Sequence, residues 1–245
     1  MTLTIYPGAI MNKGTLYLIP SLLSEGKAED VIPARTLSVL RSLDFFIAEE
    51  IRTARRFLIR AGIGKPIDDL TFMVFNEHST ESDLPELLSC TAEGRDVGLL
   101  SEAGVPCVAD PGSRIVALAH ATGIRVVPLT GPSSILLALM ASGFNGQDFC
   151  FSGYLPSDKI LRVKKIRELE RTAREKDQTQ IFIETPYRNL HLFESLVSVC
   201  HPDTMLCIAT EITGLNESIE SKTISNWKKS PPDIHKRPAI FLMYH

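Results

Sequence analysis

SEAGVPCVADPGSRIV, residues 101–116, joins an apolar run at Val97–Leu100 to a helical pattern at Arg114–Thr122. The apolar run is typical of a buried strand. Connections from a strand to a helix usually take about 2–6 residues, but Ser101–Gly112 is longer and holds two Gly, two Pro and two acids. Proline restricts and glycine widens the choice of backbone angles, so this loop has a specified shape. We expect it to meet a ligand at the carboxyl end of a strand, with an elaborate turn as the alternative.

Strand and helix patterns alternate along the chain, which predicts an α/β fold with a largely parallel, helix-covered sheet. The expected strands are 15–19, 44–48, 72–75, 97–100, 124–129, 149–152, 180–184, 205–210, 217–223 and 239–244. The expected helices are 33–43, 52–61, 82–93, 114–122, 133–142, 159–176, 187–200 and a short one at 225–229. Two strand patterns follow each other within Met205–Thr223 without a full helix between them, which predicts an antiparallel pair and a mixed second sheet.

The chain is long enough for two α/β domains. Gly123 is placed to end a helix, and the strand after it would open a second series of strands and helices. We therefore expect one domain at residues 1–123 and another at 124–245. Two such domains form a cleft, where small-molecule sites usually lie.

Composition excludes several classes of function. The net charge of −3, with 44% hydrophobic and 22% charged residues, is that of an ordinary globular protein without a global basic field. The five cysteines form no C-x-x-C pair and no zinc-site spacing, so we expect free thiols and no metal. No apolar run approaches the ~20 residues of a membrane span, and the start of the chain lacks a signal-peptide pattern. A cytoplasmic location is the resulting expectation.

Polar residues gather where the expected strands end. The loop Pro20–Asp30 is neither a G-x-G-x-x-G nor a G-K-[ST] motif, so a Rossmann dinucleotide site and a Walker A loop are excluded. The other loops offer candidates for proton transfer, for gripping a polar substrate, or for anion binding at a helix start. These candidates are Glu50 and Arg52, Asn76 and His78, Glu102, Ser133 and Ser134, Arg188, and Thr210. Capped turns and solvated surface side chains are the alternatives.

The segment Lys159–Lys176 carries eight basic and three acidic residues within an acidic protein. A solvated helix face is the usual reason for such a run. Phosphate contact is the alternative.

Taken in order, these segments resemble the tetrapyrrole methylase superfamily of S-adenosylmethionine (SAM) methyltransferases, and within it the ribosomal RNA small subunit methyltransferase I branch. That branch reads GTLYLV-P, AEDTR, SDAGTP-ISDPG, GPSA, GFLP, ESPHR and ARELTK-HE. This chain reads GTLYLIP from Gly14, AEEIR from Ala48, SEAGVPCVADPG from Ser101, GPSS from Gly131, GYLP from Gly153, ETPYR from Glu184 and ATEITGLNE from Ala209. The branch's P-T-P-I-G-N loop is replaced here by PSLLSEG.

The resemblance implies two α/β domains that hold SAM in their cleft, a homodimer, and 2′-O-methylation of a cytidine in 16S ribosomal RNA. The cofactor contacts that it implies are Leu23, Val105, Pro106, Ser133, Ser134, Ile183, Thr210 and Pro238. Because a hydroxyl nucleophile must lose its proton, we expect Glu50, Glu102 or His78 to position or deprotonate it. We expect Arg52, Asn76 and Arg188 to bind substrate, since guanidinium groups suit phosphate and carboxylate. Two alternatives remain open: methylation of a tetrapyrrole or another small acceptor, and SAM binding without catalysis.

Overall fold

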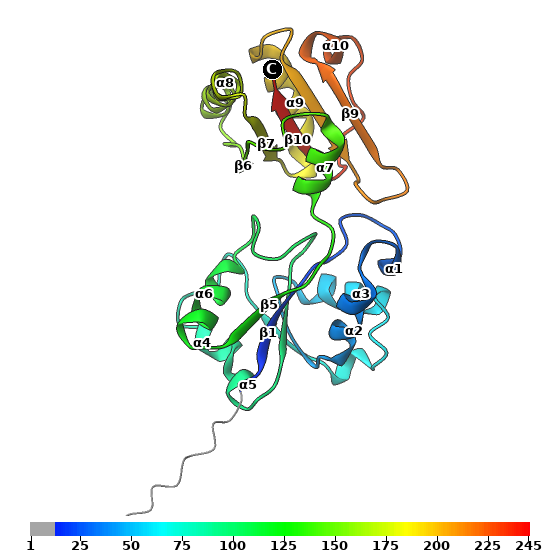
Figure 1. The fold of residues 1–245 in the computed structure, drawn as a ribbon, viewed down its shortest axis with the longest axis vertical. Helices are drawn as coiled ribbons and strands as arrows, with labels where there is room; N and C mark the ends of the chain where they lie inside the picture. Colours follow the sequence, from blue (N-terminus) through cyan, green and yellow to red (C-terminus); the bar gives the residue numbers. More distant parts are fainter. Residues whose placement is uncertain (1–12) are drawn as a thin grey trace, which may run out of the picture. The chain divides into compact units, whose positions relative to one another are not determined.

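The computed structural model describes residues 13–245, which form two compact units, each built on one five-stranded sheet (Figure 1). The first unit runs to Leu22 and resumes at Lys27–Pro132. The second unit takes the short segment Leu23–Gly26 together with Ser133–His245.

The first sheet is parallel throughout, as predicted, with strand order β3-β2-β4-β1-β5. Its strands are β1 (Thr15–Ile19), β2 (Phe45–Ala48), β3 (Thr71–Val74), β4 (Val97–Leu100) and β5 (Arg125–Pro128). Because every pair is parallel, the carboxyl ends of all five strands lie along one edge of this sheet.

Strand β5 belongs to the first unit, where it pairs with β1 so that Tyr17 lies opposite Val127. We expected this strand to open the second domain. Pairing with β1 instead gives β5 its hydrogen bonds, and the chain then enters the second unit at Ser133. The expected boundary at residues 123/124 is therefore corrected to 132/133.

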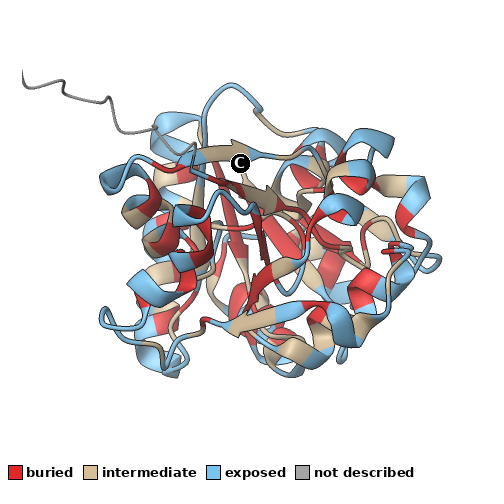
Figure 2. Cartoon of the chain, turned by 90° about the horizontal axis from the view of Figure 1, so that it is seen from below, coloured by how far each residue is buried: buried red, intermediate tan, exposed pale blue. Residues whose placement is uncertain are grey.

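Helices cover both faces of the first sheet. They are α1 (Ala28–Val31), α2 (Ala34–Ser42), α3 (Ile51–Arg60), α4 (Leu84–Leu87), α5 (Ser89–Ala92) and α6 (Ser113–Ala121), with a 3₁₀ turn at Ile67–Asp69. Neighbouring residues on β2 show the two faces, because Phe46 packs with α2 and α3 whereas Ile47 packs with α4 and α6. Buried residues accordingly run through the strands (Figure 2). The single helix expected at 82–93 is two short helices, since Leu88 leaves the helical conformation.

The second sheet is mixed, as predicted, with strand order β6-β7-β10-β8-β9. Its strands are β6 (Phe149–Tyr154), β7 (Thr179–Ile183), β8 (Met205–Thr210), β9 (Ser218–Thr223) and β10 (Ala239–Tyr244). Strands β6 and β7 are parallel and the other pairs are antiparallel, including β8 with β9.

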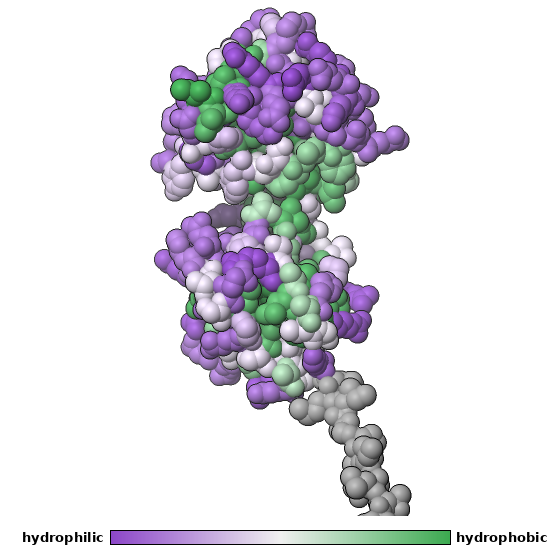
Figure 3. All heavy atoms as spheres, turned by 90° about the vertical axis from the view of Figure 1, so that its left-hand side faces the viewer, coloured by the Kyte–Doolittle hydropathy of each residue, from purple (hydrophilic) through white to green (hydrophobic). Residues whose placement is uncertain are grey.

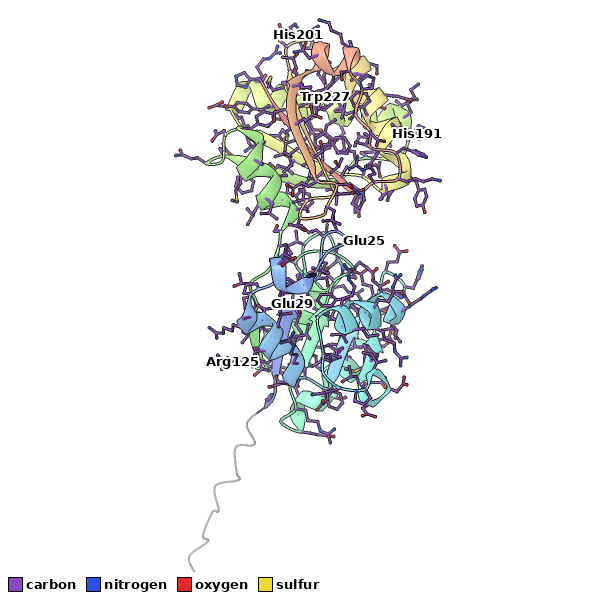
Figure 4. The ribbon with its side chains drawn as sticks, turned by 90° about the vertical axis from the view of Figure 1, so that its right-hand side faces the viewer. Glu25, Glu29, Arg125, His191, His201 and Trp227 are labelled. Atoms are coloured by element: carbon purple, nitrogen blue, oxygen red, sulfur yellow. The ribbon has the colours of Figure 1, made fainter. Side chains whose placement is uncertain are left out.

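The helices of the second unit divide unequally between the two faces of its sheet. They are α7 (Ser134–Ser142), α8 (Lys159–Lys176), α9 (Asn189–Val199) and α10 (Ile224–Lys229), with a 3₁₀ turn at Pro186–Arg188. Helix α7 packs on one face, and α8, α9 and α10 pack on the other. Trp227 lies inside this unit and donates its indole N–H to the Leu206 carbonyl at 2.8 Å (Figure 4).

Within residues 13–245, none of the helices combines the length and apolar character that a membrane span requires. His191 and His201, which flank Cys200 in the sequence, are exposed at separate places on the second unit (Figure 4). The described part of the chain contains no group of three or more His, Cys, Asp or Glu side chains arranged to hold a metal ion.

Candidate functional site

The loop after β4 is tied to the loop after β1 by two hydrogen bonds and is braced by a third within itself. Ser21 donates its backbone N–H to the Gly104 carbonyl at 2.8 Å, and its hydroxyl to the Ser101 carbonyl at 2.7 Å. The Ser101 hydroxyl donates to the same Gly104 carbonyl at 2.9 Å. The conformation of this loop is therefore set by the protein itself rather than by a ligand.

The same loop holds strained backbone. Cys107 and Ala109 have φ angles of 68° and 61°, in the left-handed region that side chains other than glycine rarely adopt. One carboxylate oxygen of Asp110 accepts the backbone N–H groups of Cys107 at 2.9 Å and Gly112 at 2.8 Å. Asp110 thus braces the loop, and strain maintained in this way is typical of functional sites.

Val105 and Pro106, the two expected cofactor contacts in this loop, differ in exposure. Pro106 is buried. Val105 is half-buried, and none of the described residues accepts a hydrogen bond from its backbone N–H. A main-chain donor at Val105 therefore stays available to a ligand.

Glu49 lies at the carboxyl ends of the strands of the first sheet, and the sequence analysis did not choose it as a candidate for proton transfer. It directly follows β2 and is half-buried. Burial, followed by the nearby carboxylates of Asp110, Glu102 and Glu77, raises its pKa to about 7. These carboxylates come from the loops after β3 and β4, so two neighbouring loops place negative charge around Glu49. A carboxyl group that titrates near neutral pH can take a proton from a substrate and return it to solvent.

Glu50, one of the three residues that we expected to position or deprotonate the nucleophile, caps helix α3. Its carboxylate accepts the backbone N–H groups of Arg52 at 2.8 Å and Thr53 at 2.7 Å, and the Thr53 hydroxyl at 2.9 Å. The hydrogen bond from the Arg52 backbone, followed by those from Thr53, lowers the pKa of Glu50. A carboxylate stabilised in its charged form is a weak base, so the capping alternative holds for Glu50.

The remaining candidates of the first unit lie on exposed loops or at their rim. Partial desolvation and then the Glu50 carboxylate raise the pKa of Glu102, which keeps it a candidate for proton exchange. His78 has an 84% exposed side chain, 3.7 Å from the Glu77 carboxylate. The Asn76 side chain closes its own turn by accepting the His78 backbone N–H at 3.0 Å. Arg52 is exposed in the first turn of α3.

In the second unit, the expected cofactor residues Ile183, Thr210 and Pro238 gather at one end of the sheet. Ile183 ends β7 and Thr210 ends β8, and both strands pair with the start of β10, which follows Pro238. The Pro238 carbonyl accepts the backbone N–H of Glu211 at 2.9 Å.

Residues next to this end of the sheet also adopt strained backbone. Glu211, Thr213 and Lys236 have φ angles of 46°, 68° and 57°. Arg237 braces this region, because it donates to the Glu211 carboxylate at 3.0 Å and to the Asn216 carbonyl at 2.7 Å. The end of the second sheet therefore resembles the loop after β4 in being strained and internally braced.

Leu23 and the start of α7 belong to the same region of the second unit. Leu23 and Ile183 pack against one apolar cluster, which includes Ala138 of α7. Next to Leu23, the Ser24 hydroxyl oxygen is buried and has no hydrogen-bond partner. Ser133 and Ser134 begin α7, and neither of their hydroxyl groups caps the helix or bonds to another described residue. These unused polar groups favour ligand binding over the capping alternative.

Arg188 is positioned by a buried carboxylate. It donates two N–H groups to one oxygen of Glu184, at 2.9 and 2.6 Å, and the Glu184 side chain is only 1% exposed. Because the Arg188 side chain is 38% exposed, its outer edge can still meet a substrate anion.

Comparisons with known proteins agree with these features. Residues 27–227 match the family described as Tetrapyrrole (Corrin/Porphyrin) Methylases. Ribosomal RNA small subunit methyltransferase I of Haemophilus influenzae is 31% identical over 233 residues, which cover 94% of this chain and 78% of the relative. The protein of the same name from Thermotoga maritima is 32% identical over 211 residues, covering 84% and 90%.

Among solved structures, the methyltransferase CobJ superposes with a TM-score of 0.64 at 21% identity, covering 95% of this chain and 94% of CobJ. That similarity confirms the two-sheet α/β fold. The match to the family and the identity to its members over most of their length show that this chain is a methyltransferase of the tetrapyrrole methylase family, in the branch of the ribosomal RNA small subunit methyltransferases I.

Proposed function

We propose that this protein transfers the methyl group of SAM to the 2′-hydroxyl of a ribose in the RNA of the small ribosomal subunit, in the cytoplasm. The names of its relatives support the RNA substrate. The observation that carries the chemistry is Glu49, a half-buried carboxyl group with a pKa of about 7 at the carboxyl ends of parallel strands. A ribose hydroxyl is a poor nucleophile until its proton is removed, and Glu49 is suited to remove it.

The unused polar groups of the chain fit SAM as the cofactor. The buried Ser24 hydroxyl, the Ser133 and Ser134 hydroxyls and the Val105 backbone N–H are donors without partners among the described residues. SAM has carboxylate, ribose and adenine groups that accept such bonds, and when bound it supplies a methyl group already activated by its sulfonium. The residues that we propose to hold it are Leu23, Val105, Pro106, Ser133, Ser134, Ile183, Thr210 and Pro238.

The residues of the chain then have separate tasks. Glu49 accepts the proton of the attacking hydroxyl, and burial, together with the carboxylates of Asp110 and Glu102, keeps its proton affinity high. Arg52, Asn76 and Arg188 orient the RNA by hydrogen bonds to phosphate or base. Alignment of nucleophile and methyl group supplies much of the rate, because the methyl donor needs no further activation.

The first experiment separates substrate classes. Purified protein is titrated calorimetrically with SAM, and methyl transfer from labelled SAM is measured to small ribosomal subunits and, in parallel, to porphyrin precursors. We expect SAM binding and transfer to the ribosomal subunit. Transfer to the porphyrin precursor alone would establish the small-acceptor alternative, and absence of SAM binding would overturn the cofactor proposal.

We also propose that the protein is a homodimer, as the family resemblance implies. Helix α7 exposes Leu136 and Met140, which lie one turn apart and are 53% and 79% exposed. Apolar side chains of this size on adjacent turns are typical of interfaces. Met140→Asp is expected to convert a dimer to a monomer in light scattering, whereas a wild-type monomer would refute the proposal.

A further inference from the structure

Helix α8 presents unpaired positive charge on the surface of the second unit. It carries eight basic side chains against three acidic ones. The acids are already engaged: Glu168 pairs with Lys165 at 3.0 Å, and Glu175 lies 4.0 Å from Arg171. Glu170 accepts the Thr204 hydroxyl and the His201 backbone N–H. The cations of the first turns therefore keep their charge free for a partner.

Those cations line a surface hollow of about 390 Å³. Its walls are Lys159, Ile160, Val163, Lys164 and Arg167. In the part of the chain that the structure describes, no carboxylate forms an ion pair with Lys159, Lys164 or Arg167. Ile160 is 79% exposed and adds an apolar surface among the charges. Seen from the side of α8, the second unit shows a hydrophobic patch bordered by hydrophilic side chains (Figure 3).

The hollow is fixed in place by the residues that start the helix. The Asp158 carboxylate caps α8 by accepting the Leu161 backbone N–H at 2.9 Å. The buried Arg162 donates to the Ser157 carbonyl at 2.8 Å and to the Ser195 hydroxyl of α9 at 3.1 Å. The positive end of the helix dipole also lies at this end of α8. A preformed positive surface loses little conformational freedom when an anion binds.

We propose that this α8 face, made of Lys159, Ile160, Val163, Lys164 and Arg167, binds the sugar–phosphate backbone of the RNA substrate. The inference rests on the proposed RNA methylation and adds a second contact region to it. At 1.5 Å per residue, the three cations extend over about 12 Å of helix axis, the length of about three to four nucleotides.

The balance of charged and apolar groups favours RNA over a membrane surface. Helices that lie on membranes expose a broad apolar face. The apolar face of α8 is instead buried in the core through Ile166 and Leu169. The exposed side chains of α8 are mainly charged, and Ile160 and Leu161 are the exposed apolar side chains of its first turn.

The test compares two triple variants that each remove three positive charges. The first is Lys159→Gln, Lys164→Gln and Arg167→Gln on the α8 face. The matched control is Arg125→Gln, Lys228→Gln and Lys229→Gln, which are exposed side chains outside this face. Binding of a labelled single-stranded oligoribonucleotide is followed by fluorescence anisotropy at several salt concentrations. Circular dichroism and SAM titration check that both variants are folded.

If three phosphate contacts are lost, the slope of log affinity against log salt becomes shallower by about 2 units. The affinity advantage of the wild type over the α8 variant should therefore shrink by about twentyfold between about 50 and 200 mM salt. The control variant should keep the wild-type slope. With small ribosomal subunits as substrate, the α8 variant should raise KM and leave kcat unchanged, because it removes binding shared by ground and transition states.

The outcomes separate this inference from the proposed function. If the wild type methylates small ribosomal subunits but the α8 variant keeps its salt slope and KM, the α8 inference is wrong and the proposed function stands. If the wild type binds phosphatidylserine vesicles through this face and no RNA, the α8 face is a membrane surface. If the wild type transfers no methyl group to ribosomal subunits although SAM binds, the proposed RNA substrate fails.

Discussion

Replacing Glu49 by Gln tests the assignment of the base most directly. The change keeps the size of the side chain and removes its ability to accept a proton. Loss of a general base typically lowers the rate by about 10²–10⁴, or about 3–5 kcal/mol of transition-state stabilisation. We therefore expect kcat for methyl transfer to fall by that factor while the affinity for SAM is unchanged.

The pH dependence of the methyl-transfer rate gives a second quantity that can be measured. With a pKa of about 7, Glu49 is ionised to about 9% at pH 6 and about 91% at pH 8, so the wild-type rate should rise about tenfold across this range. The Glu49→Gln variant should lose this rise. The assay is single-turnover transfer of labelled methyl groups at saturating SAM, over a series of buffers of constant ionic strength.

The same carboxyl group should also make the fold less stable at high pH. The ordinary pKa of 4.5 is raised to about 7 in the folded state, so between these values the folded protein holds a proton that the unfolded chain releases. The free energy of unfolding therefore falls as pH rises through this window, and the penalty is complete above about pH 7. Glu49→Gln removes the penalty, so its urea midpoint should exceed that of the wild type at about pH 8 but not at about pH 4.

Two results would refute this reasoning. One is a Glu49→Gln variant with wild-type kcat and an unchanged pH profile, which would mean that the hydroxyl loses its proton elsewhere. The other is a variant that is inactive but no more stable than the wild type at about pH 8. That result would mean that the Glu49 carboxyl is not desolvated and that its loss acts by another route.

Three further changes test the structure around the site. Glu50→Ala removes the cap of α3 and should lower the urea midpoint, whereas Glu50→Gln should retain methyl transfer. Arg188→Ala leaves the buried Glu184 carboxylate without its partner and should cost about 2 kcal/mol, more than the double change Arg188→Met with Glu184→Gln; equal losses would contradict the pairing. A Cβ at Gly131 would lie 2.3 Å from the Pro20 Cβ, so Gly131→Ala should lower the urea midpoint through overpacking of about 2 kcal/mol, and an unchanged midpoint would show that this approach relaxes freely.

The α/β alternation, most element positions and the antiparallel pair at β8 and β9 could be predicted because each depends on local periodicity and on Gly and Pro positions. The sheet to which β5 belongs could not be predicted, because an apolar strand pattern does not specify which strand it pairs with. Its pairing with β1 satisfies its hydrogen bonds in the first sheet, and only the folded topology reveals this.

The candidate site, too, could be predicted only in part. The sequence identified the loop after β4 and the ends of the strands, yet it favoured Glu50 over Glu49. The pKa values of these neighbouring carboxyls shift in opposite directions, because Glu50 accepts helix N–H groups whereas Glu49 is partly buried and lies among carboxylates from distant loops. Glu102 and Asp110 are more than fifty residues beyond Glu49 in the sequence, so their effect on its pKa requires the fold. An acid directly after a buried strand was the signal available.

The central position of β10 determines when the second unit can form during synthesis. This strand is hydrogen-bonded to both β7 and β8, and without it the sheet is two separate pairs of strands. All strands of the first unit precede Pro132, so that unit can fold while the rest of the chain is still being made. At about 5–20 residues per second, β10 follows β5 by roughly ten seconds. Once β7 and β8 have been made, the edges that β10 will pair with stay open until it follows, which exposes the nascent second unit to wrong strand pairing.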